Sequence, residues 1–400
     1  MSIEITQCRL CGNEKFEQLV DLGEQPLANG LVKEKVNQPC YPLVVVECTC
    51  CGHVQLKHTI EPTELFLEYA FHTASSSSMV QHFSKLIQDH LPESGLVVEI
   101  GSNDGAVLET IKQNNIIKLG IDPSINLCEE AARRGVNTYN DFFGTSIIPS
   151  VVNSYGRAKL IVCCNVLGHV HDLTDFVRAI KLLLAPGGTV VIEVPYVYDL
   201  HSKCAFDTIY VEHISYFSIS SVVQLFNRHG MGVQSIEPQK VHGGTNRYVI
   251  THDNNSNQVK WEVEKESHVK LNWTSFNEAL QQLRHNLVAR LNEYKEKGLK
   301  VVGYGAAAKA AVMLNYCGIG TDLLPMIVDC TEYKQGLLMP GTFQLVVHPK
   351  NMLEYNPDVI LILAWNHAAE IVNKEHDLVS AGKIFITPDL VQVLALPKGI

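Results

Sequence analysis

The stretch Val97-Val-Glu-Ile-Gly-Ser-Asn-Asp-Gly105 decides the fold of the central part of the chain. An apolar run that enters a glycine turn predicts a buried strand, a loop whose backbone can approach a ligand closely, and then a helix. A second stretch, Val301-Val-Gly-Tyr-Gly-Ala-Ala-Ala-Lys309, has the same form. The first carries Glu99 and Asp104, which suit a cationic ligand, whereas the second carries Lys309, which suits a phosphate. The chain therefore has two candidate ligand loops with opposite charge preferences.

The composition is that of a globular protein with more than one domain. The chain has 400 residues, of which 46% are hydrophobic, and this is enough for more than one core. We expect a cytoplasmic protein without membrane contact, because neither a run of about 18 apolar residues nor a secretory signal pattern is present. A net charge of -10 argues against nucleic acid as a partner, since basic surfaces bind phosphate backbones. The 12 cysteines favour metal ligation over a disulfide framework.

Two cysteine pairs near the start of the chain have the spacing of a zinc ribbon. The pairs are Cys8 with Cys11 and Cys48 with Cys51. Two thiolates in one tight turn can reach a tetrahedral ion at about 2.3 Å, and four sulfurs leave no open position, so we predict a structural zinc ion. Cys50 and Cys40 are alternative ligands, and ordinary buried thiols are the alternative to a metal site. The other cysteines are predicted to be small core residues: Cys128, Cys163, Cys164, Cys204, Cys317 and Cys330.

Strands and helices alternate after residue 95 as in a doubly wound parallel sheet. The predicted strands are 96–100, 117–121, 160–164 and 189–194, and a helix with Val107, Leu108 and Ile111 should follow the first strand. Asp122 ends the second strand, where an acid can accept hydrogen bonds from ribose hydroxyls. Asn165 and His169 follow a later strand, at the sheet edge that binds ligands. This order resembles class I S-adenosylmethionine-dependent methyltransferases, and the Gly-x-Gly-x-x-Gly pattern of nicotinamide dehydrogenases is absent.

The segment Phe206-Asp-Thr-Ile-Tyr-Val-Glu-His-Ile-Ser-Tyr-Phe-Ser218 is the richest in acid and base groups. Tyr210, Glu212 and His213 are predicted to lie in a strand end or loop, ahead of a helix capped by Ser220 or a neighbour. A histidine with a pKa of about 6.5 can remove a proton near neutral pH, and a neighbouring carboxylate can fix its tautomer. The segment is therefore a candidate catalytic cluster. The alternative is a histidine that only satisfies local hydrogen bonds.

The C-terminal part predicts a second α/β sheet. Residues 260–299 form a predicted amphipathic helix that links or braces domains, and 300–302, 327–328 and 361–365 are predicted strands, with Trp365 in the core. Residues at the ends of parallel strands converge on one crevice. The candidates there for a diphosphate and nucleotide are Tyr304, Lys309, Asp329, Lys334, Asn366 and His367.

Motifs along almost the whole chain resemble the nucleotide-sugar C-methyltransferase family. They are Cys8-x-x-Cys11, Cys48-x-x-Cys51, the loop 69–79, Glu99-Ile-Gly-Ser-Asn-Asp-Gly105, Tyr210-Val-Glu-His213, His242-Gly-Gly244, Gly303-Tyr-Gly-Ala306 and Ala364-Trp-Asn-His367. The resemblance implies a small N-terminal zinc-binding domain, a class I methyltransferase Rossmann-like central domain and a C-terminal Rossmann-like α/β domain. We place them at residues 1–68, 69–250 and 251–400. The loop 69–79 is either a linker or a lid over a ligand.

The same resemblance implies a role for each candidate residue. His213 would be the general base, with Tyr210, Glu212 and His169 around the reacting sugar. S-adenosylmethionine would contact Glu99, Gly101, Ser102, Asn103, Asp104, Gly105, Asp122, Pro123 and Asn165. A nucleotide-linked 4-keto-6-deoxy sugar would contact Tyr69, Phe71, His72, His242, Gly243, Tyr304, Gly305, Lys309, Asp329, Lys334, Asn366 and His367.

The chemistry of carbon methylation fits this assignment. A 4-keto group acidifies the hydrogen on C3, so a base can form an enolate that attacks the sulfonium methyl group in line. The Tyr210 hydroxyl would either relay the proton or stabilise the enolate charge. Two alternatives remain, a sugar O-methyltransferase, which needs no ketone, and a non-catalytic sensor that binds the nucleotide sugar or S-adenosylmethionine. We expect a monomer or a weak homo-oligomer.

Overall fold

The computed structural model describes residues 2–390 and 392. The chain divides into two compact units, each assembled from segments that are distant in sequence. Unit 1 contains Met1–Gln18, Val46–Asp199 and Glu212–Leu271, and unit 2 contains Leu19–Val45, Leu200–Val211 and Asn272–Ile400. None of the helices in the described residues has both the length and the apolar character needed to cross a bilayer.

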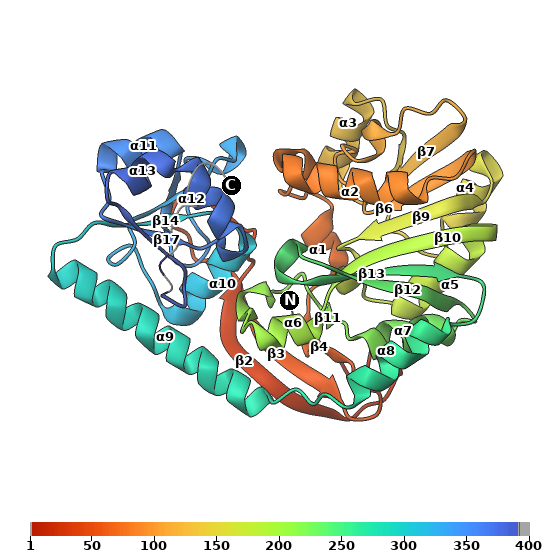
Figure 1. Ribbon diagram of the computed structural model, residues 1–400, viewed down its shortest axis with the longest axis horizontal. Coiled ribbons are helices and arrows are strands. Elements are labelled where there is room, and N and C mark those ends of the chain that lie inside the picture. Colours follow the sequence, from red (N-terminus) through yellow and green to blue (C-terminus); the bar gives the residue numbers. More distant parts are fainter. Residues whose placement is uncertain (1, 391, 393–400) are drawn as a thin grey trace. The chain divides into compact units, whose positions relative to one another are not determined.

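A seven-stranded sheet in the order β12-β13-β10-β9-β6-β7-β8 forms the centre of unit 1 (Figure 1). In chain order its strands are β6 (Gly95–Ile100), β7 (Ile116–Ile121), β8 (Thr138–Tyr139), β9 (Ala158–Cys164), β10 (Leu184–Pro195), β12 (Gly232–Gln239) and β13 (Thr245–Thr251). The strands from β10 to β8 are parallel, whereas β13 runs antiparallel to β10 and β12 antiparallel to β13. The predicted α/β sheet and its four predicted strands are confirmed.

Helices cover both faces of this sheet because its strands are apolar on both sides. On one face, α2 (Ser77–His90) packs Phe83 and Leu86 in a core with Val97 and Val162. The other face is covered by α4 (Ile148–Tyr155), α5 (Leu173–Leu183) and α7 (Ile219–Asn227). Helix α3 (Ile125–Arg133) follows β7, and α8 (Asn257–Ser267) follows β13. Ser218, a neighbour of the predicted cap Ser220, caps α7 through a capping box with Ser221.

The helix predicted after Gly105 is wrong. Only the 3-10 turn η2 (Leu108–Thr110) forms there, although Val107, Leu108 and Ile111 are buried as expected. The Thr110 hydroxyl donates to the Val107 carbonyl at 2.7 Å, and such local side-chain bonds compete with the helical ladder. The first ligand loop therefore has no α-helix N-terminus behind it, and its ligand contacts must come from side chains and loop backbone.

Short elements complete unit 1. They are β1 (Ile3–Glu4), β4 (Val54–Leu56), β5 (His58–Thr59), α1 (Pro62–Phe66), η1 (Thr73–Ser75), η3 (Leu167–His169), β11 (Ser215–Tyr216) and η5 (Val241–Gly243). Strand β11 pairs antiparallel with β4, and β1 pairs antiparallel with β5. Helix α2 starts at Ser77, inside the predicted loop 69–79, because the Ser76 hydroxyl caps it by accepting from the Met79 amide. Helix α6 (Val197–Ser202) spans the chain division after Asp199.

Unit 2 is built on a five-stranded parallel sheet in the order β16-β15-β14-β17-β18 (Figure 1). Its elements are β14 (Val301–Tyr304), α10 (Ala308–Cys317), β15 (Met326–Val328), η6 (Glu332–Lys334), β16 (Leu345–Val347), α11 (Pro349–Tyr355), β17 (Val359–Ile362), η7 (Trp365–His367), α12 (Ala368–Lys374), α13 (His376–Ser380) and β18 (Ile384–Ile386). Most of β2 (Phe16–Pro26) and β3 (Cys40–Cys48) belongs to the same unit, as does η4 (Phe206–Thr208). The predicted C-terminal α/β sheet is confirmed.

Two predictions for this part need correction. Residues 260–299 do not form one helix, because the chain breaks after α8 and restarts as α9 (Trp273–Glu296), where the Asn272 side chain accepts from the Ser275 amide. Strand β17 stops at Ile362, so Trp365 lies in the 3-10 turn η7 and is only half-buried. Trp365 is therefore not a core residue of the sheet.

Candidate active site and zinc centre

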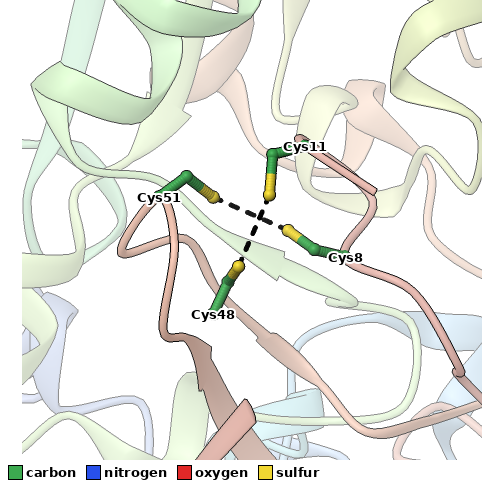
Figure 2. A group of neighbouring side chains, drawn as sticks. All are labelled: Cys8, Cys11, Cys48 and Cys51. Atoms are coloured by element: carbon green, nitrogen blue, oxygen red, sulfur yellow. Dashed lines mark hydrogen bonds between the residues drawn. The ribbon is translucent and has the colours of Figure 1, made fainter. Parts of the chain in front are cut away.

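Four cysteines from two knuckles form a closed cluster, with their sulfur atoms facing one another (Figure 2). All four Sγ atoms lie within 4.8 Å of one another, with 3.7 Å between Cys8 and Cys51 and 3.5 Å between Cys11 and Cys48. Tetrahedral zinc with bonds of about 2.3 Å would set its sulfurs about 3.8 Å apart, so the cluster fits the ion. Cys40 and Cys50 are exposed and lie outside the cluster, as does Cys330, which is exposed rather than the predicted core residue.

Amide groups support the sulfur atoms of this cluster. Gln55 Nε2 donates to Cys8 Sγ at 3.2 Å, and Asn13 Nδ2 donates to Cys48 Sγ at 3.5 Å. Donors of this kind stabilise thiolates, which are the form that binds metal. The sulfur atoms of the zinc centre therefore accept hydrogen bonds from two amide side chains, which the cysteine spacing alone does not indicate.

The acidic ligand loop carries buried polar atoms that lack a partner. Glu99 Oε2, Ser102 Oγ and Asn165 Oδ1 are buried, and none has a hydrogen-bond partner among the described residues. They lie near the carboxyl ends of β6 and β9, which are neighbouring parallel strands. Gly101, at φ +68°, closes the turn, and a Cβ there would stand 2.3 Å from a Val166 methyl group. The ammonium and ribose hydroxyl groups of S-adenosylmethionine would satisfy such acceptors, so the loop fits this cofactor.

Burial shapes the protonation of the acids in this loop. It raises the pKa of Glu99 well above the ordinary value, and the neighbouring carboxylates of Asp122 and Asp104 raise it further. Burial also raises the pKa of Asp122, although the backbone amides of Ser124 and Asn103 oppose this. Those amides donate to Asp122 Oδ1 and Oδ2 at 2.9 and 2.8 Å, so each oxygen of this predicted ribose acceptor already accepts one hydrogen bond. A cationic ligand would favour the ionised acids.

Residues 69–76, here named the lid loop, are fastened to the acidic loop by hydrogen bonds. The Asn103 side chain donates to the Phe71 carbonyl and accepts from the Thr73 amide, each at 2.9 Å. The Ala74 amide donates to Asp104 Oδ2 at 3.0 Å. These contacts favour the lid interpretation over a linker. Sequence reasoning placed Asn103 only in the cofactor loop and did not predict its bonds to the lid.

The other residues predicted around the cofactor and lid lie in the same unit. Asp104 and Gly105 complete the loop after Asn103, Pro123 follows β7, Tyr69 and His72 lie in the lid loop, and Gly243 lies in η5. The Phe71 side chain is 41% exposed, so its ring is accessible to a ligand. The side chain of His242 is outside the described part of the structure.

Two histidines meet at the end of β9. The rings of His169 and His213 have centroids 4.9 Å apart in an edge-to-face arrangement. His169 Nδ1 lies 2.7 Å from the Glu212 carbonyl oxygen, which only accepts, so Nδ1 carries the hydrogen. Burial lowers the pKa of His169 below the ordinary value, so this ring is neutral near pH 7. The structure thus brings together His169, Glu212 and His213.

Tyr210, the fourth predicted catalytic residue, belongs to the segment Leu200–Val211 of unit 2. The chain passes from unit 2 to unit 1 directly after Val211, so Glu212 and His213 lie in unit 1. All three lie in a loop, as expected, between η4 and β11. The role of Tyr210 beside the histidines stays a prediction.

Several residues predicted to bind the nucleotide form hydrogen bonds that hold the loop of unit 2 together, and their contact with a nucleotide stays a prediction. Asp329 Oδ2 accepts from the Ala306 amide at 2.7 Å, and Lys334 Nζ donates to the Ala306 carbonyl at 2.9 Å. The Tyr304 hydroxyl donates to Glu375 at 2.7 Å. Gly305 has φ +96°, and a Cβ there would stand 2.6 Å from the Ala364 methyl group. The tight loop therefore requires glycine, and its charged neighbours fix its shape.

Lys309 lies beside an aromatic ring and an amide, and near an acid that the sequence analysis did not propose as a site residue. Lys309 Nζ lies 4.5 Å from the centre of the Trp365 ring and 3.4 Å from Asn366 Oδ1. The Trp365 indole donates to Asp207 Oδ2 at 2.6 Å. Burial raises the pKa of Asp207 to about 6, although the Lys309 ammonium opposes this. The predicted candidate His367 is exposed and lies 3.4 Å from Glu370.

Comparisons with known proteins agree with these features. Family models match a zinc binding domain at residues 8–66, a methyltransferase domain at 69–236 and a C-methyltransferase C-terminal domain at 240–388. The C-methyltransferase NovU of Streptomyces niveus is 32% identical, over 96% of this chain and 95% of its own.

Two solved structures bear only a distant likeness. A SAM-dependent methyltransferase from Thermotoga maritima is 16% identical with a TM-score of 0.33, covering 44% of this chain and 89% of its own. An S-adenosylmethionine-dependent methyltransferase from Clostridium acetobutylicum is 11% identical with a TM-score of 0.35, covering 44% and 91%. The assignment does not rest on them.

The sheet order of unit 1, its acidic loop and the four-cysteine cluster define a class I S-adenosylmethionine-dependent methyltransferase with a zinc-binding N-terminal region. Within that class, the chain belongs to the C-methyltransferase family. Its cofactors are S-adenosylmethionine and zinc.

Proposed function

We propose that the chain transfers a methyl group from S-adenosylmethionine to C3 of a nucleotide-linked 4-keto-6-deoxy sugar. Carbon methylation needs a base beside the acceptor carbon, because a sugar C–H is not nucleophilic until a neighbouring carbonyl acidifies it. The observation that carries the proposal is the pair of rings, His169 and His213, 4.9 Å apart in the unit that holds the cofactor loop. Because the His169 ring is neutral, it does not repel the proton that His213 takes up.

In this reaction His213 removes the C3 proton, and the enolate carbon then takes the methyl group. The cofactor, when bound, supplies an electrophilic methyl group on a sulfonium centre. His169 stays neutral because burial lowers its pKa, and donation of its Nδ1 hydrogen to the Glu212 carbonyl at 2.7 Å leaves Nε2 as the unprotonated nitrogen. We assign to Tyr210 the relay of the proton or the stabilisation of the enolate oxygen, and to Glu212 the placement of the histidine pair.

The binding residues are assigned by the unit that carries them. The cofactor contacts Glu99, Ser102, Asn103, Asp104, Asp122 and Asn165, and the lid loop with Phe71 covers the acceptor. In unit 2, Lys309 neutralises the diphosphate, since its ammonium already lies beside Trp365 and Asn366. The proposed domain boundaries are 1–68, 69–250 and 251–400, and the family matches at 8–66, 69–236 and 240–388 support them.

The exchange of the C3 hydrogen tests this function. The enzyme is incubated in deuterium oxide with S-adenosylhomocysteine and a panel of thymidine- and guanosine-diphosphate 4-keto-6-deoxyhexoses, and deuterium at C3 is measured by mass spectrometry. Wild type should incorporate deuterium, and His213→Gln should slow this by about 10² or more while keeping cofactor affinity. His90→Gln is the matched control, because His90 Nδ1 lies 2.9 Å from the Leu86 carbonyl oxygen one turn earlier in α2.

Three results would contradict the proposal. No exchange with any sugar of the panel would exclude the enolate route to a 4-keto sugar. A methyl gain on an oxygen, without C3 exchange, would indicate an O-methyltransferase. Loss of S-adenosylhomocysteine binding in His213→Gln would indicate a structural histidine instead of a base.

A further inference from the structure

Arg9 lies inside the first zinc knuckle, between Cys8 and Cys11, and its side chain reaches the backbone of β4 and of the segment before β11. Its Nη1 lies within hydrogen-bond distance of the Leu56 carbonyl (2.9 Å), the Ile214 carbonyl (3.2 Å) and Gln55 Oε1 (3.2 Å). Its Nη2 is fully buried. The contacts are thus made by Nη1, and Nη2 has no hydrogen-bond partner in the described part of the chain.

The acceptor at Ile214 follows His213 directly in the chain. The Ile214 carbonyl also accepts from the Leu56 amide at 3.0 Å, and the Ile214 amide donates to the Gly168 carbonyl at 2.9 Å. Gly168 precedes His169, so one residue is bonded both to the zinc-binding region and to the turn that carries the second histidine. Because His213 precedes Ile214 in the chain, these hydrogen bonds restrict the position of the His213 backbone, from which its side chain extends.

The zinc cluster is joined to the same strand pair through Gln55. Gln55 Nε2 donates to Cys8 Sγ at 3.2 Å, and its Oε1 accepts from the Arg9 amide at 3.2 Å. In the pairing of β4 with β11, Gln55 stands opposite Ser215, two residues after His213. A continuous set of hydrogen bonds thus runs from the cysteine sulfurs to the backbone beside the histidine pair.

We propose that Arg9 is a positioning residue for methyl transfer, which couples the zinc knuckle to the placement of His213. The proposal rests on the proposed function, in which His213 is the base. Bound zinc would then do more than stabilise the N-terminal region, because it would hold the turn from which Arg9 reaches Ile214. A displacement of about 1 Å at a reacting group can cost about 10² in rate, so a loosened Ile214 should lower kcat.

The test compares Arg9→Gln and Arg9→Lys with the control Arg228→Ala. Arg228 also donates to the first knuckle, at the Leu10 carbonyl (3.2 Å), and among the described residues no hydrogen bond joins its side chain to Ile214. Zinc content is measured by mass spectrometry, S-adenosylhomocysteine affinity by calorimetry, and backbone opening by hydrogen exchange of residues 53–56 and 212–216. The rate of C3 deuterium incorporation gives the catalytic readout, and Arg9→Lys serves as the comparison should Arg9→Gln not fold.

With zinc retained, Arg9→Gln should raise exchange at 212–216 at least about fivefold and lower the catalytic rate about tenfold to a hundredfold, with cofactor affinity within about twofold. Arg9→Lys should recover part of both losses, and Arg228→Ala should change neither. Unchanged exchange at 212–216 in zinc-loaded Arg9→Gln, or an equal increase in Arg228→Ala, would overturn the proposal. If wild type shows no C3 exchange, the proposed function fails, and the hydrogen-exchange result still decides whether Arg9 fixes the segment.

Discussion

Replacement of Glu99 by glutamine should make the ligand-free protein less sensitive to rising pH. Burial raises the pKa of Glu99 in the folded protein, so the folded state holds a proton that the unfolded state has already lost. Between the ordinary pKa and the raised one, the folded state binds more protons, so the free energy of unfolding falls as pH rises. The loss is about 1.4 kcal/mol per pH unit for one proton. Glu99→Gln keeps the size of the side chain and removes this part of the pH dependence.

Urea denaturation followed by circular dichroism measures the effect. Wild type and Glu99→Gln are unfolded without ligand at several pH values above about 4.5, the region in which an ordinary glutamate is ionised. As pH rises, the free energy of unfolding of Glu99→Gln should increase relative to that of wild type. Asp122, whose pKa burial also raises, contributes a slope of the same sign in both proteins.

The same substitution should weaken the cofactor. Glu99 Oε2 has no hydrogen-bond partner in the part of the chain that the structure describes, and a hydrogen bond between it and a ligand cation would contribute about 1.5–3 kcal/mol. Calorimetry should therefore show S-adenosylmethionine binding weakened about tenfold to a hundredfold. Parallel pH curves for the two proteins, together with an unchanged Kd, would refute the placement of Glu99 in the cofactor site.

Three further predictions follow from the contacts. Cys48→Ser should release zinc and lower Tm, whereas Cys50→Ser, at an exposed position, should retain one zinc ion per chain by mass spectrometry; equal loss would contradict the assigned ligands. Asn103→Ala removes two hydrogen bonds to the lid loop, about 1 kcal/mol each, so exchange of its amides should rise about tenfold or more, and no rise would show that the bonds do not hold it. Lys309→Met should raise KM for the nucleotide sugar about tenfold without changing cofactor affinity, and an unchanged KM would exclude Lys309 from the diphosphate site.

Features encoded by local patterns could be predicted from the sequence. The four central strands, the two glycine loops and the cysteine knuckles each depend on residues a few positions apart, and all are confirmed. Two predictions made from local patterns were wrong, namely the helix after Gly105 and the strand through Trp365. Apolar spacing indicated an element, but a side-chain hydrogen bond at Thr110 and the end of β17 at Ile362 decided its form.

The supporting contacts of the site could not be predicted in the same way. Arg9 reaches a backbone carbonyl at Ile214, and Asp207 reaches the Trp365 indole, across long stretches of chain. A backbone carbonyl has no residue-type signature, so a single sequence cannot indicate which one a buried arginine will meet. For Asp207 the sequence held one weak signal. It is an acid in the segment 206–218, which is rich in acid and base groups, but it was not proposed as a site residue.

The two neighbouring histidines are best explained as a base and a ring that stays neutral beside it. If both imidazoles were protonated, two positive charges would lie 4.9 Å apart between ring centres in a partly buried site. Burial lowers the pKa of His169, and this outweighs the opposite effect of the hydrogen bond from Nδ1 to the Glu212 carbonyl. A proton that arrives on His213 therefore meets a neutral, polarisable ring instead of a second cation. On this argument His169→Lys should impair proton removal more than His169→Asn, even though lysine is the larger and more basic replacement, because only lysine places a second positive charge beside the base.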